Sequence, residues 1–331
     1  MAHVILSFYR TNMCSSSNLA AIAVAGLVAL AARTPGVEAF LGGRAAGGRQ
    51  TSRLQAASGY KLGAKTTALT INNRYVVERL EKALPDGVEM SEVALLRFAL
   101  AFPEPGAAER ALKSAASWRR GAGKHIVDAA AEAVAKATAN GGWDNEAVRD
   151  AAPHAAIINK YIGPKSVMTL STDDGDLVYV IRASAIDDKK LMDAASVEQV
   201  CDFFMYAKEV HNLVANARSE RTGRMCSVIF ANDISGVRKA PDRRFSKALT
   251  SSSDQYEDLY PSLAGPTMIL NLPFVLQAFV GLLKPLFPKS VQERLVFKRA
   301  PVLAGLKELT PLATSEKTKT SFVREVKTLL P

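Results

Sequence analysis

The sequence has little cysteine. Three cysteines occur in 331 residues, and one of them, Cys14, lies close to the N-terminus. Small secreted domains that depend on disulfides use cysteine far more densely, so this pattern argues against that class of protein. We expect the other two, Cys201 and Cys226, to be small core residues rather than a bridged pair.

The clusters that metal and catalytic centres need are also missing. The four histidines are scattered, and together with the cysteines they give no metal-ligand spacing, so we expect no metal and no cofactor. There is no Gly-x-Ser-x-Gly motif, and the last histidine, His211, precedes most candidate serines, against the order of α/β hydrolases. Residues 121–124 (Gly-Ala-Gly-Lys) lack the earlier glycine of a phosphate loop, which favours a helix linker. We therefore predict no catalytic residues, with an α/β hydrolase-like enzyme as the rival.

Acidic residues are nearly absent from the first 77 positions, which hold eight basic residues and a single acid, Glu38. This stretch alone accounts for +7 of the formal charge of +10. The remainder has 34 basic and 31 acidic residues and is almost balanced. Because the excess charge is confined to one end, we expect no nucleic-acid partner.

Long apolar runs are scarce at the N-terminus too. The run Leu19–Ala32 has fourteen residues, fewer than the roughly 20 that cross a bilayer. Small residues flank Glu38 in Val37-Glu38-Ala39, as at a signal-peptide cleavage site. We predict a signal peptide at 1–39, with a retained anchor as the weaker alternative. The acid-free, basic residues 40–70 have the composition of a transit peptide.

The order of these two segments predicts a destination. A secretory signal followed by a transit-like stretch that begins at Phe40 resembles the two-part presequences of algae whose plastids have extra membranes. We therefore expect the protein in a plastid. The alternative is secretion, or the lumen of the endomembrane system, with a disordered basic arm.

Hydrophobic periodicity changes along the rest of the chain. Four helices are predicted first, at 75–84, 91–100, 107–120 and 126–139. A hairpin of two strands follows, at 167–171 and 177–181. Helices at 197–217, 243–256 and 274–287 then alternate with strands at 225–231, 267–272 and 295–298. This rhythm predicts an α/β fold in which an all-helical lobe precedes a mostly parallel sheet covered by helices.

One segment is unusually apolar. Eleven of the sixteen residues from Leu272 to Phe287 are apolar, and the five exceptions fall within one arc of about 120° on a helix. A helix that rests on a sheet needs a narrower apolar stripe. The surplus must meet another protein layer, a bound lipid or a membrane surface.

Several segments occur in the order of a known family. They are Leu95-Leu96-Arg97-Phe98 with Trp118-Arg119, the strand-like Gly175 to Arg182, Asp233-Ile234-Ser235-Gly236, Tyr260-Pro261, Ile269 to Phe274, and Leu283 to Phe287. Their order and spacing over roughly residues 75 to 300 resemble the CRAL-TRIO domain of phosphatidylinositol-transfer, tocopherol-binding and retinal-binding proteins.

The resemblance implies a carrier rather than an enzyme. In that family the helix after the Asn-x-Pro-Phe turn closes a hydrophobic lipid cavity, which would be the helix 274–287 here. The resemblance implies a lipid or another apolar small molecule as the ligand and transient contact with a membrane, and we expect a monomer. The implied lipid-contacting residues are Phe274, Leu276, Phe279, Val280, Leu283, Lys284 and Phe287 of the gate, with Tyr260 and Ser262 before it. A ligand-free interaction module of the same fold is the second alternative.

The identity of the ligand stays open. Lys284 occupies the position whose lysine contacts the lipid phosphate in phosphoinositide-binding members, although it also fits a solvated polar stripe. Those members carry Glu after Tyr-Pro, where this chain has Ser262, which removes an acceptor for inositol hydroxyls. The expected organisation after residue 70 is a helical module at 71–125, a helical linker at 126–165, the lipid-binding domain at 166–310 and a basic tail at 311–331.

Overall fold

The computed structural model describes residues 63–139, 143–171, 175–233, 241–270 and 295–297. The described helices are α4 (Thr66–Lys82), α5 (Glu92–Ala101), α6 (Pro105–Arg120), α7 (Lys124–Ala137), α8 (Asn145–Asp150), α9 (Ala155–Ile158), α10 (Asp188–Ala194), α11 (Val197–Thr222), α12 (Arg243–Asp254) and α13 (Tyr256–Leu259). A 3-10 turn covers Ala183–Ala185. The described strands are β1 (Val167–Ser171), β2 (Leu177–Arg182), β3 (Val228–Asp233), β4 (Ala264–Leu270) and β5 (Leu295–Phe297).

The first helices form a module with its own apolar centre. Ser91 caps α5, because its hydroxyl accepts a hydrogen bond from the Ala94 amide at 3.3 Å. Helix α6 begins at Pro105, a residue suited to the first turn because it needs no amide partner there. Leu80, Leu96 and Leu112, one from each of α4, α5 and α6, are fully buried. The apolar spacing seen in the sequence thus packs three short helices together.

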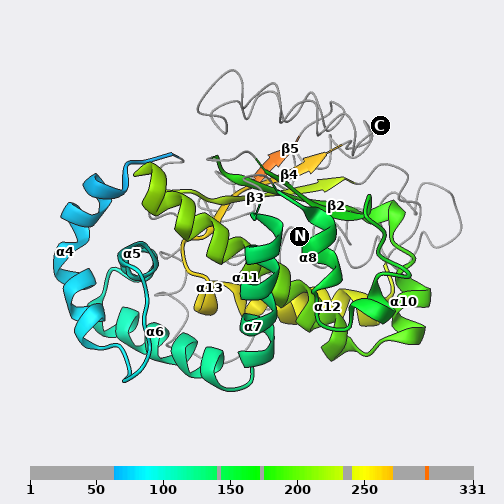
Figure 1. Ribbon diagram of the computed structural model, residues 1–331, viewed down its shortest axis with the longest axis horizontal. Helices are drawn as coiled ribbons and strands as arrows, with labels where there is room; N and C mark the ends of the chain where they lie inside the picture. Colours follow the sequence, from blue (N-terminus) through cyan, green and yellow to red (C-terminus); the bar gives the residue numbers. More distant parts are fainter. Residues whose placement is uncertain (1–62, 140–142, 172–174, 234–240, 271–294, 298–331) are drawn as a thin grey trace, which may run out of the picture.

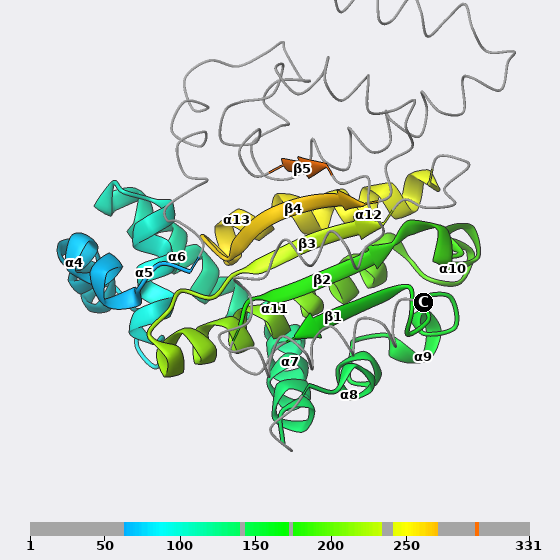
Figure 2. The same cartoon turned by 90° about the horizontal axis from the view of Figure 1, so that it is seen from above.

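The five described strands form one sheet in the order β1-β2-β3-β4-β5. Strands β1 and β2 form the predicted antiparallel hairpin, and every later pair is parallel. Helix α11 connects β2 to β3, and α12 and α13 connect β3 to β4, as crossovers between parallel strands require. In Figure 1, α7, α11, α12 and α13 lie together on one side of the sheet, and Figure 2 shows the strands from the other side. The predicted α/β fold class is confirmed.

Helix α11 is five residues longer at its C-terminal end than the predicted 197–217. Its start is a capping box between Ser196 and Gln199, and its end is Gly223 in the left-handed conformation, with φ of 64°. The extra turn carries polar side chains that are buried by tertiary contacts: Arg218 donates to the Gly175 carbonyl, and Ser219 accepts from the Cys226 amide. Periodicity alone gives no sign of such contacts.

Two other predicted bounds are wrong for similar reasons. Helix α4 begins at Thr66 rather than Tyr75, since the Thr66 amide donates to the Gly223 carbonyl at 3.0 Å and the start is therefore set by a distant turn. Strand β3 begins at Val228 rather than Met225. Met225 and Cys226 are fully buried in the connection before it, so burial made that connection resemble a strand.

Strand β4 begins at Ala264, earlier than the predicted 267, and includes a glycine and a proline that sequence rules keep out of strands. Its register against β3 shifts between Val228 and Phe230, an irregularity that accommodates them. A Cβ on Gly265 would lie 3.3 Å from both the Ser227 Cβ and the Val228 carbonyl oxygen. The close approach of β3 therefore favours glycine at this position.

Helix α11 carries buried polar side chains. His211 is 2% exposed, and its Nε2 lies 2.8 Å from the Thr169 hydroxyl of β1. Burial, with a smaller effect from the charge of Lys208, lowers the pKa of His211 to about 3. Burial also lowers the pKa of Lys208 to about 7, and its ammonium donates to the Ser252 carbonyl at 2.5 Å.

The linker predicted at residues 121–124 is confirmed, since it joins α6 to α7. The Gly123 amide donates to the Trp118 carbonyl at 2.8 Å, which folds the linker back over the Trp118 ring. A Cβ on Gly123 would lie 2.4 to 2.5 Å from carbon atoms of that ring. None of the helices in the described ranges combines the length and apolar character of a membrane span.

The contact at Gly123 predicts a stability loss. Gly123→Ala should lower the free energy of unfolding by about 1 to 3 kcal/mol, because the indole ring or the linker must move. Gly106→Ala is the matched control, since a Cβ there meets only the Arg110 Nη1 at 3.6 Å. Urea denaturation measures both, and equal stability of the two variants would contradict the packing described here.

The buried His211 predicts a pH dependence of stability. In the unfolded chain a histidine titrates near pH 6.5, whereas folded His211 stays neutral down to about 3. As the pH falls below 6.5, only the unfolded chain takes up this proton, so the free energy of unfolding falls by up to about 1.4 kcal/mol per pH unit. His211→Gln should lower that slope in urea denaturation, whereas His125→Gln, at an exposed site, is the control. Equal slopes for all three proteins would refute the assignment.

Candidate functional site

The two faces of the sheet differ in what packs against them. Side chains alternate between the faces along each strand. Leu177 and Tyr179 of β2 and Val228 of β3 belong to the buried apolar cluster that includes α11. Their face, here called the helix face, is therefore the core side of the sheet.

The opposite face carries a second apolar surface. Six side chains form it, and we call it the far face: Met168 and Leu170 of β1, Val178 and Val180 of β2, and Ile229 and Ala231 of β3. Met168 is 3% exposed and the other five are fully buried. Within the described residues, none of the six belongs to the cluster around α11. The sheet thus buries apolar side chains on both sides, although the crossover helices lie on one side (Figures 1 and 2).

Backbone register arranges the far face in two rows that run across the strands. One row is Met168, Val180 and Ala231, and the other is Leu170, Val178 and Ile229. Neighbouring strands lie about 4.8 Å apart, so each row presents a continuous apolar strip. Ala231 is the smallest side chain in its row.

An ion pair lies at the end of the far face where β2 and β3 finish. Arg182 and Asp233 are paired in register on the same face, one step beyond Val180 and Ala231. The Arg182 Nε lies 3.4 Å from the Asp233 Oδ2, and the Asp233 side chain is 4% exposed. Arg182 Nη1 also donates to the Lys165 carbonyl at 3.4 Å. Both contacts are long for charge-assisted hydrogen bonds.

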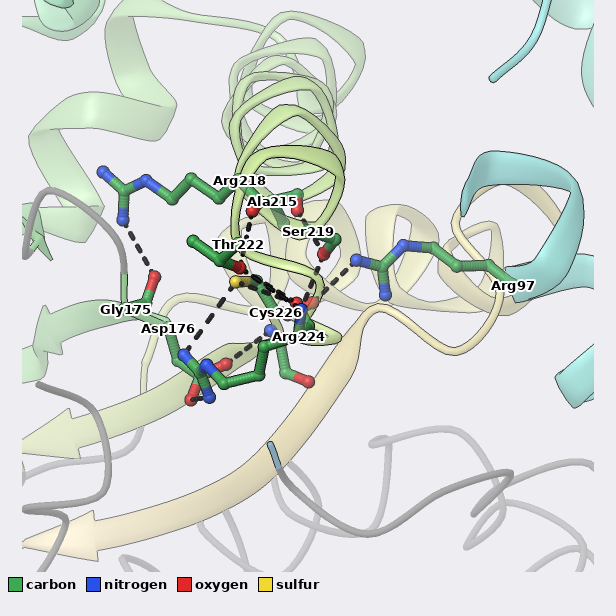
Figure 3. Close-up of polar contacts among 10 residues, drawn as sticks. Arg97, Gly175, Asp176, Ala215, Arg218, Ser219, Thr222, Arg224 and Cys226 are labelled. Atoms are coloured by element: carbon green, nitrogen blue, oxygen red, sulfur yellow. Dashed lines mark hydrogen bonds and ion pairs between the residues drawn. The ribbon is translucent and has the colours of Figure 1, made fainter. Parts of the chain in front are cut away.

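The other end of the far face is also polar. Asp176, fully buried, accepts from the Ser227 amide at 2.7 Å and from Arg224 Nη1 at 3.1 Å. Burial raises the pKa of the Asp176 carboxyl, while the charge of Arg224 acts in the opposite direction. Figure 3 shows this pair beside the end of α11. The apolar rows are therefore bounded by charges at both ends of the strands.

Beside Asp176, Arg97 reaches the sheet from the helical module (Figure 3). Its guanidinium donates to the Asn216 side-chain oxygen at 2.7 Å, the Ser262 carbonyl at 2.8 Å and the Cys226 carbonyl at 2.6 Å. Arg97 is 2% exposed. Its role in the described residues is to join helices α5 and α11 to the segments that precede β3 and β4.

Tyr260 and Ser262, predicted to contact the ligand, lie at this same junction. Tyr260 is buried. Its ring meets the Trp118 ring edge to face, with 6.5 Å between the ring centroids. The Arg119 guanidinium carbon lies 5.5 Å from the centroid of the Tyr260 ring. Burial, with an added effect of Glu209, raises the pKa of the Tyr260 phenol well above its ordinary value. Ser262 has a φ of 50°, a left-handed conformation that is uncommon for serine. Ligand contact by these two residues stays a prediction.

The other predicted site residues, Phe274, Leu276, Phe279, Val280, Leu283, Lys284 and Phe287, lie outside the described residues. Sequence reasoning missed the far face and the pair at its end. The signal was present in β2, where Leu177 to Ile181 has no polar alternation and so indicates a strand buried on both faces.

The two cysteines in the described residues, Cys201 and Cys226, are not joined in a disulfide. Cys226 is buried and Cys201 is partly exposed. Across the described ranges no three His, Cys, Asp or Glu side chains gather so that they could hold a metal ion.

The chain is similar to one protein family and to a solved structure. Residues 164–313 match the family model of the CRAL/TRIO domain. Among solved structures, the chain is similar to the crystal structure of Sfh5, with 13% identity and a TM-score of 0.42 over 71% of this chain and 83% of that chain. No curated protein matches the chain. The family match agrees with the resemblance seen in the sequence: residues 164–313 are similar to the CRAL/TRIO domain.

Proposed function

We propose that the protein binds a lipid or similar apolar small molecule against the far face and carries it between membranes without chemical change. The buried far face is the observation that supports this proposal most. Each Val, Leu, Ile or Met side chain on it gains about 1.5 to 3 kcal/mol when removed from water. An apolar ligand gains in the same way from lying on these rows.

The proposal includes the helix at 274–287 as the gate over this ligand. Phe274, Leu276, Phe279, Val280, Leu283 and Phe287 would contact its apolar part, and Lys284 would lie near a polar group. A lipid leaves a bilayer only if its new site replaces most of its apolar contacts, at about 0.8 kcal/mol per CH₂. A sheet face and an apolar gate together meet that requirement better than either does alone.

The setting of this activity is also a proposal. Transient contact with a membrane surface would let the ligand exchange, and a monomer suffices for it. The signal-like and transit-like segments at 1–39 and 40–70 support delivery to a plastid, with the lumen of the secretory pathway as the alternative.

Organic extraction of the purified chain tests the carrier function. We expect about one lipid or pigment molecule per chain by mass spectrometry, and movement of that molecule between donor and acceptor vesicles. A compact protein that holds no ligand and transfers none would instead support an interaction module of the same fold. Release of a cleaved lipid product would support the enzyme alternative.

A substitution in the proposed gate is the sharper test. Phe279→Asp should reduce ligand retention and vesicle transfer at least tenfold, because a carboxylate on the apolar side of the gate is costly to bury. Phe279→Leu keeps an apolar side chain and should retain most of the transfer. Circular dichroism and urea denaturation establish that both variants fold. Unchanged transfer by Phe279→Asp would show that the gate lies elsewhere.

A further inference from the structure

The ion pair of Arg182 and Asp233 lies at the end of two apolar rows, where its contribution to stability does not explain its presence. Strand alternation puts both side chains on the far face, and their register places them directly beyond Val180 and Ala231. The Asp233 side chain is almost fully buried. A buried ion pair contributes little stability compared with apolar side chains of similar size, so stability alone gives a weak reason for it.

The contacts of Arg182 leave it able to bind something else. A guanidinium has five N–H donors. In the part of the chain that the structure describes, the Arg182 side chain makes two hydrogen bonds, each 3.4 Å long, and a quarter of it is exposed. Well-formed bonds of this type are about 2.7 to 2.9 Å long. The arginine is thus positioned by its neighbours but is not saturated by them.

The chemistry of the pair selects the ligand group. An anionic group next to Arg182 would also meet the Asp233 carboxylate and be repelled. A hydroxyl both donates and accepts, and it can bind the two partners at once. We infer that Arg182 and Asp233 hold the hydroxyl group of an uncharged lipid whose apolar body lies along the far face. This inference rests on the proposed function and names the class of ligand.

The geometry also limits the ligand's orientation. From Arg182 to Asp176, which with Arg224 forms the charged pair at the other end, β2 covers about 20 Å at 3.3 Å per residue. An apolar body longer than this would meet the Asp176 carboxylate unless it turned across the strands along the two rows. A lipid that carries its hydroxyl at one end of a single chain or fused ring system satisfies this limit.

Displacement of the fluorescent apolar probe 1-N-phenylnaphthylamine from the full chain tests the inference. The competitors are dodecanol, dodecane and dodecanoate, and the variant is Arg182→Met with Asp233→Leu, which removes both charges together. We expect the affinity ratio of dodecanol to dodecane to fall about tenfold in this double variant, the effect of losing hydrogen bonds to charged groups. The same two competitors are used with the parent chain and with the double variant. The hydration free energies of free dodecanol and dodecane therefore cancel when the two ratios are compared. Arg74→Gln with Glu78→Gln, an exposed ion pair, is the control and should leave the ratio unchanged.

The outcomes separate the two proposals. If the probe binds but the double variant leaves the ratio unchanged, the pair is only structural and the inference fails while the carrier function stands. If dodecanoate loses more affinity than dodecanol in the double variant, the group recognised is anionic and the inference also fails. If the probe does not bind the parent chain, both proposals fail.

A ligand-side comparison needs no variant and covers the case in which the double variant fails to fold. Dodecyl methyl ether accepts a hydrogen bond but cannot donate one to Asp233. We expect dodecanol to bind the parent chain about tenfold more tightly than the ether, although the ether is more apolar. Equal or tighter binding of the ether would overturn the inference.

Discussion

A single buried guanidinium fixes where the helical module meets the sheet. Arg97 of α5 donates to one side-chain oxygen and two backbone carbonyls, in segments that lie far apart along the chain. Two of these acceptors, the carbonyls of Cys226 and Ser262, belong to the segments that lead into β3 and β4. An arginine buried without such acceptors would cost several kcal/mol. The hydrogen bonds of Arg97 therefore set both the position of the helical module and the start of β3 and β4. The far face begins at this end of the strands.

From this edge, the alternation of side chains along the strands divides the structure into a core and a candidate site. Tyr179 and its neighbours on the helix face pack against α11, where His211 and Lys208 are buried with specific partners. Val178, Val180, Ile229 and Ala231 on the far face are buried and together form an apolar surface. The helix face has polar contacts that specify one arrangement, whereas an apolar surface accepts any apolar partner of suitable shape. That difference favours the far face as the place where an exchangeable ligand lies.

The sequence predicted the fold where local signals agree with the tertiary structure. The hairpin of β1 and β2 and the α/β order follow from strand propensity and turns, and the capped start of α5 follows from Ser91. Bounds set by distant contacts could not be predicted: α4 begins where Thr66 bonds to Gly223, and α11 extends because Arg218 and Ser219 have buried partners. The same limit holds for the site. Tyr260 and Ser262 were singled out by motif, and their contact with a ligand stays a prediction. The pairing of Arg182 with Asp233 depends on the register of β2 and β3, which cannot be read from the sequence.

Under the proposed function, a ligand would lie between the far face and the mostly apolar residues 272–287. A helix that only covers a sheet needs an apolar stripe of about 100°, but the sequence from Leu272 to Phe287 is apolar over roughly twice that arc. If that helix simply closed the far face, part of its apolar surface would remain without a partner. In the proposed carrier, a bound lipid would contact both surfaces and remove the surplus from water, and an open gate would present the same surplus to a bilayer. The surplus apolar arc would then have an apolar partner in either state, which would let a ligand be taken up and released.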